Sequence, residues 1–215
     1  MTISNAPKLL KGGLVLIDPQ SAAIEQVITF QYNPESLSRT LQMQATTSEG
    51  DRSQPLRLRG PAVETLKLDV VLDAIDQLEQ ADAGATEFGI HPQLAVFESL
   101  LHPGSDQLIS NNELAMSGVL EIIPMEQPLL LFIWSKHRIL PVRLTDFSIT
   151  EEAFDTALNP IRAKLSVGLR VLSVDDLGFD HKGGSLFLNY LQHKEGLAGA
   201  ASTSGLEALG IGGIP

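Results

Sequence analysis

The sequence predicts a mainly β fold with one flanking helix, arranged as an antiparallel barrel or sandwich. Several segments place apolar residues at every second position, which is the pattern of half-buried strands. Two pairs of predicted strands are joined by polar corners that contain Asn-Pro. Strands and helices do not alternate as they do in parallel α/β folds. About seven strands are expected on this pattern.

The two polar corners lie far apart in the chain, within residues 30–39 and 149–163. Each corner joins two predicted strands, through Asn33-Pro34 in the first and Asn159-Pro160 in the second. Proline fixes its own φ and restricts the residue before it, so each corner sets the exit direction of the next strand. Two such corners favour a closed or nearly closed β-structure over an enzyme pocket.

The first half of the chain predicts four strands and one long loop. The strands are expected at residues 9–18, 27–32, 37–43 and 66–73, and the last of these has the clearest alternation. Gly12-Gly13 is typical of a bulge or a close approach of two backbones. Residues 46–62 are polar and lack a helical period, which predicts a functional or disordered loop.

The second half predicts one clear helix and three more strands. Residues 73–87 are acidic and indicate a loop with some helix, and residues 92–101 form the flanking helix. Strands are expected at residues 129–134, 139–149 and 163–171, the first of them buried on both faces. A short helix at 185–197 precedes a Gly-rich tail. Residues 1–178 are therefore expected to form one β domain, with residues 179–215 as a helical segment and tail.

Composition excludes several classes of function. The 215 residues carry a formal net charge of −11, which opposes binding to nucleic acid and to anionic membranes. Cysteine is absent, so the chain has no disulfide framework and no thiolate metal site. No signal peptide and no apolar run long enough to insert into a membrane are visible, so a cytoplasmic protein is expected.

The sequence contains no catalytic constellation, so the protein is not expected to be an enzyme and no cofactor or metal is expected. The five histidines do not cluster at metal-ligand spacings. Glu151, Glu152 and Asp155 lie close together in the second corner and could act as an acid–base pair in an enzyme. The simpler interpretation is that they solvate a turn and pair with Arg162, because nothing nearby supplies a nucleophile.

Charged residues of opposite sign are candidates for a contact between subunits. Arg52, Arg57 and Arg59 lie in the long polar loop, and Asp73 and Asp76 lie in the acidic segment that follows the fourth strand. These surfaces could simply be solvated. Alternatively, the basic loop of one subunit contacts the acidic face of the next, and such head-to-tail contacts close into rings.

The corner phrases resemble the tube-protein family of contractile injection systems. The resemblance covers about residues 8–172 and rests on Phe30 to Arg39, Ile149 to Ala163 and the opening Lys11 to Pro19. It implies a tube fold, a β-barrel-like pair of packed sheets with a helix at its side. Phe30, Tyr32 and Leu37 are expected to hold the corner and the core and not a contact between subunits. Many relatives continue into a LysM domain, whereas here only a short helical segment and a Gly-rich tail are expected after residue 172.

The resemblance also implies a partner set and a place in a particle. Six copies would form a ring at the baseplate, joining the trimeric spike to the inner tube protein, and would contact other baseplate components. Assembly would take place in the cytoplasm, within a contractile injection particle. An alternative of a different class is a monomeric ligand-binding β-barrel with an apolar cavity. The mass in solution separates the two hypotheses.

Overall fold

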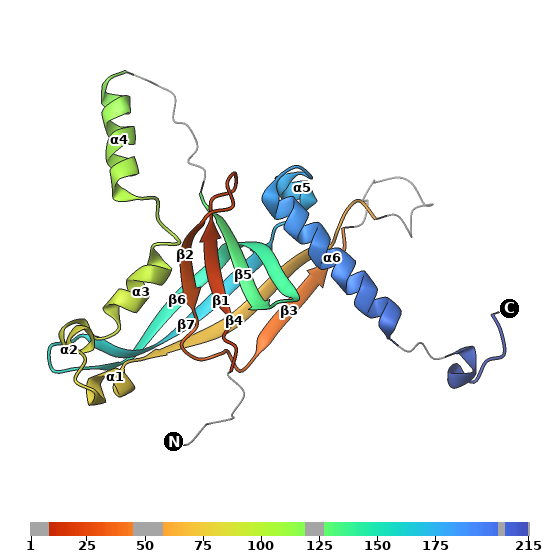
Figure 1. Ribbon diagram of the computed structural model, residues 1–215, viewed down its shortest axis with the longest axis horizontal. Helices are drawn as coiled ribbons and strands as arrows, with labels where there is room; N and C mark the ends of the chain where they lie inside the picture. Colours follow the sequence, from red (N-terminus) through yellow and green to blue (C-terminus); the bar gives the residue numbers. More distant parts are fainter. Residues whose placement is uncertain (1–8, 45–57, 119–126, 202–204, 215) are drawn as a thin grey trace, which may run out of the picture.

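The computed structural model describes residues 9–44, 58–118, 127–201 and 205–214. Its centre is one seven-stranded antiparallel sheet in the order β2-β1-β5-β6-β7-β4-β3 (Figure 1). The strands are β1 (Gly13–Ile17), β2 (Ile24–Thr29), β3 (Leu37–Gln42), β4 (Val63–Asp73), β5 (Leu129–Ser135), β6 (Arg138–Phe154) and β7 (Pro160–Val171). The mainly β prediction is confirmed.

The sheet is coiled but not closed. One core cluster includes Leu14 of β1, Phe132 of β5 and Leu68 of β4, so the two halves of the sheet pack on a common interior. The connection that contains the first Asn-Pro corner runs from β2 to β3, and these are the two edges of the sheet. The corner joins two strands as predicted, and these are the two edge strands of the sheet and not hydrogen-bonded neighbours.

Polar side chains fix the first corner to both halves of the sheet. The side-chain amide of Gln31 donates to the Asp73 carbonyl at 2.6 Å, and its oxygen accepts from the Asp73 backbone N–H at 2.9 Å. Asn33 bonds in the same way to the backbone of Leu10 and Gly12. Phe30 is buried as predicted, whereas Tyr32 is half exposed and does not belong to the core.

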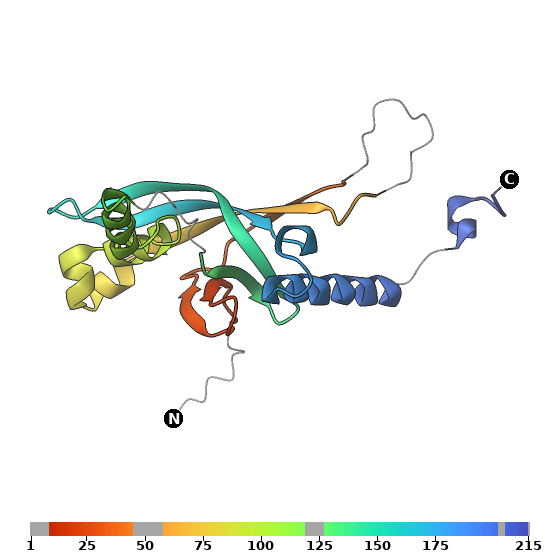
Figure 2. The same ribbon diagram turned by 90° about the horizontal axis from the view of Figure 1, so that it is seen from above.

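More helix is present than the sequence predicted. The α-helices are α1 (Ile75–Glu79), α2 (Ala83–Phe88), α3 (His91–Glu98), α4 (Ser105–Met116), α5 (Val174–Leu177) and α6 (Lys182–Ala200), followed by the 3-10 helix η1 (Leu206–Leu209). Helices α1 to α3 lie at one end of the sheet, and α5 and α6 at the other (Figure 2). Within the described residues, no helix is long and apolar enough to cross a membrane.

Strand ends differ from the predictions by up to five residues: β1 begins four residues later than expected, and β4 and β7 each begin three residues earlier. Strand β2 begins and ends three residues earlier than expected, and β6 runs five residues further, up to the second corner. The prediction that β5 is buried on both faces is confirmed, because the four residues from Leu129 to Phe132 are all buried. Gly13 also lies against the backbone of Ile28 so closely that a Cβ would overlap it, which explains the glycine.

Candidate assembly surfaces

The carboxylates of the second corner hold the corner itself. Asp155 accepts hydrogen bonds from the backbone N–H groups of Ala157 and Asn159, at 2.7 and 2.8 Å, and from the Asn159 side chain at 2.9 Å. The hydrogen bonds from Asn159 lower the pKa of Asp155. Glu152 pairs with Arg162 at 3.4 Å, as the sequence predicted. These groups are occupied by structural contacts and form no acid–base pair.

The described residues contain no group of three potential metal ligands of the His, Cys, Asp and Glu types. The fold nevertheless brings together two histidines that are distant in sequence. His137, in the turn between β5 and β6, stacks on His193 of α6 with ring centroids 4.6 Å apart. A pair of stacked rings presents flat faces to each other and does not converge on a metal position, so this contact packs α6 against the hairpin.

A buried polar cluster anchors α6 to the sheet. The Glu64 carboxylate of β4 is only 3% exposed and lies 2.7 Å from the Arg39 guanidinium of β3 and 3.1 Å from Lys194 Nζ of α6. The Tyr190 hydroxyl donates to the same carboxylate at 3.1 Å. Burial by itself raises the pKa of Glu64, but hydrogen bonds and charges from Arg39 and Lys194 outweigh it and lower that pKa.

One face of the sheet is polar and laced with ion pairs. Strands β4 and β7 alternate between buried apolar and exposed polar side chains, so Lys67, Asp69, Lys164 and Arg170 share the outer face. Asp69 and Lys164 lie 2.8 Å apart, and their hydrogen bond lowers the pKa of Asp69 and raises that of Lys164. This face therefore carries exposed charges of both signs.

Both edges of the sheet expose apolar side chains. Strand β2 carries Ile24 and Val27, and β3 carries Leu41, with Met43 directly after it; all four are more than half exposed. In the described residues neither edge strand has a neighbour on its outer side. Open edges of this kind are templates for pairing with another chain.

The structure separates the predicted basic and acidic contact residues. Arg52 and Arg57 lie outside the described residues. Arg59 is exposed near the start of β4, whereas Asp73 and Asp76 follow at its far end, about 30 Å away for a strand of this length. Asp73 already lies near Arg162, at 3.9 Å, and accepts from a backbone N–H, while Asp76 is exposed.

Acidic charge is concentrated in the helices beyond β4. Residues 68–135 hold 11 of the 26 acidic residues and none of the 15 lysines and arginines, so the rest of the chain is neutral. We call residues 75–116, with α1 to α4, the acidic lobe. In this lobe α4 has no buried residue and stands clear of the sheet (Figure 1). Leu108, Ile109 and Met116 of α4 are at least half exposed.

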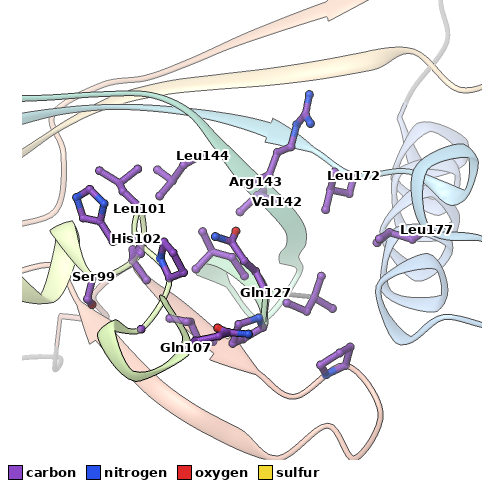
Figure 3. A pocket seen from close by; sticks show the side chains of 18 of the residues that line it. Ser99, Leu101, His102, Gln107, Gln127, Val142, Arg143, Leu144, Leu172 and Leu177 are labelled. Atoms are coloured by element: carbon purple, nitrogen blue, oxygen red, sulfur yellow. The ribbon is translucent and has the colours of Figure 1, made fainter. Parts of the chain in front are cut away.

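A hollow of about 1030 Å³ opens beside the sheet (Figure 3). It lies between the α3–α4 connection, the ends of β1 and β5, the middle of β6 and the segment around α5. We call this space the hollow. Within the described parts of the chain, its walls are mainly leucine and proline, and its lining contains Arg143, His102 and His181 but no carboxylate.

Comparison with protein families identifies the fold. A family model described as "contractile injection system tube protein" matches residues 16–176, which is most of the chain. The chain belongs to this family. The sequence resemblance to contractile injection system tube proteins is therefore confirmed.

Solved structures similar to this tube protein come from gene transfer agent particles. One is a chain in the tail of an empty particle computed with helical refinement and C6 symmetry, with 11% identity, coverage of 74% of this chain and 90% of that chain, and a TM-score of 0.29. Another, from the virion of the native particle, has 12% identity, coverage of 77% and 95%, and a TM-score of 0.28. No curated protein matches this chain.

The tube-protein match covers only part of the described structure. It begins in β1 and ends within α5, so it includes the sheet from β2 to β7 and the whole acidic lobe. Helix α6 and η1 follow the matched segment. The Glu64 cluster and the His137–His193 stack therefore join an element outside the match to the tube-protein core.

Proposed function

We propose that this tube protein is a non-enzymatic ring subunit, six copies of which join the trimeric spike to the inner tube at the baseplate. The observation that carries the proposal is the open sheet with two apolar edges. A monomer that leaves Ile24, Val27 and Leu41 exposed beside unpaired strand edges is open to edge-to-edge association. A ring of copies covers both edges of every subunit, because each β2 edge meets the β3 edge of a neighbour.

The distribution of charge supports a head-to-tail contact. Arg59 and Asp76 lie at opposite ends of the same sheet, and unlike patches on one subunit favour a heterologous interface. Arg52 and Arg57 belong to the same basic segment in the sequence. We propose that this segment contacts Asp73 and Asp76 of the next subunit, with Asp76 as the freer partner.

Elements that project from the sheet support a position between unlike partners. A subunit that joins a trimeric spike to a hexameric tube must present one set of contacts to its own copies and others to each neighbour. Helix α6, the C-terminal segment and the acidic lobe all project from the ends of the sheet and provide such separate surfaces (Figures 1 and 2). On this proposal the particle is assembled in the cytoplasm, with no direct contact to nucleic acid.

The competing hypothesis, a monomeric ligand-binding barrel, has less support. Such a protein encloses its ligand inside a closed barrel, whereas this sheet is open and its interior is filled by side chains of the main core. The hollow lies beside the sheet and opens to solvent. Of the three carboxylates in the second corner, Asp155 and Glu152 are engaged in contacts within the corner.

The mass of the purified protein tests the proposal directly. We expect rings of six copies, alone or when the spike and inner tube proteins are added, and particles that bridge the two in electron micrographs. A protein that stays at its 23.2 kDa monomer mass under both conditions would contradict the ring proposal. It would then favour the ligand-binding barrel.

Reversing the basic charges tests the head-to-tail contact. The double variant R57E/R59E is expected to raise the protein concentration needed for ring formation by about tenfold, because like charges then face each other across the interface. Combining these changes with D76K should restore assembly. Sedimentation velocity across a concentration series measures the effect, and a circular dichroism melt checks that the subunit is folded.

The double variant K136E/K182E is the matched control, because it changes net charge equally at exposed sites away from the proposed contact. It should assemble as the unmodified protein does. If both double variants weaken rings equally, or if D76K does not rescue, the contact between the basic segment and Asp76 is wrong.

A further inference from the structure

The C-terminal segment of the chain carries apolar side chains with nothing of its own to cover them. We call residues 205–214 the C-terminal tail. Every residue in this range is exposed. Leu206, Leu209 and Ile211 are 40%, 74% and 43% exposed, and the first two lie on η1. Both ribbon views place this tail clear of the sheet (Figures 1 and 2). A short helical turn with apolar side chains is the usual form of a segment that docks in a groove.

The hollow is a receptor of matching chemistry. Leu16, Leu101, Leu129, Leu144, Leu172 and Leu177 contribute most of its apolar wall. Figure 3 shows Leu144, Leu172, Leu177 and Leu101 around one open space. Its volume of about 1030 Å³ lies at the upper end of the range for ligand pockets, which leaves room for several side chains.

Charge distinguishes this space from the rest of an acidic molecule. Among the residues that the structure describes, the lining of the hollow includes one arginine and two histidines and no carboxylate. The C-terminal tail carries one carboxylate, Glu207, and no lysine or arginine. The charges that line the hollow therefore do not repel the C-terminal tail. The acidic lobe as a whole is negatively charged and would repel an acidic segment.

The geometry of α6 points to a second copy as the occupant. His181, beside the N-terminus of α6, lines the hollow, and the helix then carries the chain about 27 Å away over its 19 residues. The residues that follow would have to run back fully extended to reach their own hollow, and η1 could not form. A second copy located beyond the C-terminal end of α6 can receive the tail in its hollow without this extended return path.

We infer that the C-terminal tail of one copy docks in the hollow of a second copy, with Leu206, Leu209 and Ile211 against its leucine wall. This inference rests on the proposed assembly of copies and adds a defined contact to it. The contact links an element outside the tube-protein match to the core of a neighbour. It thus makes α6 a spacer that sets the distance between two subunits.

Peptide binding tests whether the hollow accepts the tail. A chain that ends at Ala201 should bind a fluorescent peptide of residues 202–215 with a dissociation constant on the order of 100 µM or tighter. Changing Leu206, Leu209 and Ile211 of the peptide to serine should weaken binding by at least about tenfold. The variant L101E in the receptor should do the same, while L158E, at an exposed hairpin tip, should not. Equal binding in all four combinations of receptor and peptide, or no binding in any of them, would overturn the inference.

Cross-linking tests whether the contact joins two copies, and the absence of cysteine makes it simple. An L209C protein mixed with an L101C protein should give a cross-linked dimer with a short bismaleimide, and L209C mixed with L158C should not. A double variant L101C/L209C that cross-links only within one chain would contradict the contact between copies. Rings that form while the peptide fails to bind would refute the tail contact alone. Peptide binding without any ring would refute the proposed hexamer and leave the contact intact.

Discussion

Replacing Glu64 with glutamine is expected to lower the free energy of unfolding by about 3 kcal/mol. The side chain keeps its size, so the loss comes from charge rather than from a cavity. Arg39 and Lys194 would each keep a positive charge beside a neutral amide, with about a third or less of each side chain exposed to water. Urea denaturation followed by circular dichroism measures the difference.

The control for this variant is E152Q. Glu152 is 43% exposed and forms one ion pair, with Arg162 at 3.4 Å. Pairs of this kind contribute about 0.5 kcal/mol, so E152Q should be nearly neutral. If the two variants lose the same stability, the Glu64 cluster contributes no more than a surface pair, and α6 is anchored by its buried residues Phe187 and Tyr190 and by the His137–His193 stack.

The same cluster predicts a dependence of stability on pH. The pKa of Glu64 is lower in the folded protein than in the unfolded chain, where it is about 4.3. The folded state therefore gains stability from Glu64 at pH values above about 4.3, and this gain disappears as the pH falls through the folded pKa. The difference in stability between the unmodified protein and E64Q should be constant near pH 7 and shrink below about pH 4.

The alternation of apolar residues predicted the strands because apolar side chains at every second position lie on the buried face of a strand. In β4, Leu66, Leu68, Val70 and Leu72 all face the core as their spacing required. The same spacing places Glu64 on the buried face, two residues before Leu66. A charged residue at an inward position of a strand is a signal that could have identified the cluster, although its partners Arg39 and Lys194 could not be read from the sequence.

Helix α4 was missed because its sequence has no strong apolar stripe and none of its residues is buried. An amphipathic pattern predicts a helix only when the helix packs on its own chain, and α4 does not. The role of the first corner was also out of reach. Its Asn-Pro sequence predicts a turn, but that the turn spans the sheet from β2 to β3 depends on the order of strands formed far along the chain.

The assembly surfaces were only partly predictable for a similar reason. The basic and acidic segments are visible as composition, and the structure adds that Arg59 and Asp76 lie at opposite ends of β4. The hollow could not be predicted, because its walls come from five separate parts of the chain. The sequence does show that residues 68–135 contain no lysine or arginine. These residues form one acidic surface only because the fold gathers α1 to α4 at one end of the sheet.

Replacing Gly89 with alanine is expected to lower the free energy of unfolding by about 3 kcal/mol. Gly89 has φ 59° and ψ −130°, a conformation that residues with a side chain rarely adopt. A Cβ at this position would also overlap the carbonyl oxygen of Pro160 in the second corner. That oxygen accepts a hydrogen bond from the Ile90 backbone N–H at 2.8 Å, so any shift that relieves the overlap loses the bond.

The G89A change is therefore expected to disrupt the contact between the acidic lobe and the second corner. Asn159 donates to the Glu87 carbonyl at 3.2 Å, so the end of α2 should loosen together with the corner. The matched control is G196A, in the interior of α6, where a Cβ meets no atom within 4 Å. Because alanine favours the helix, G196A should raise stability by about 0.5–1 kcal/mol. Opposite signs for these two Gly-to-Ala changes in thermal melts would support this account of the corner. A G89A protein as stable as the unmodified chain would mean that the second corner does not depend on close contact with Gly89, and that the acidic lobe is attached through its apolar core residues instead.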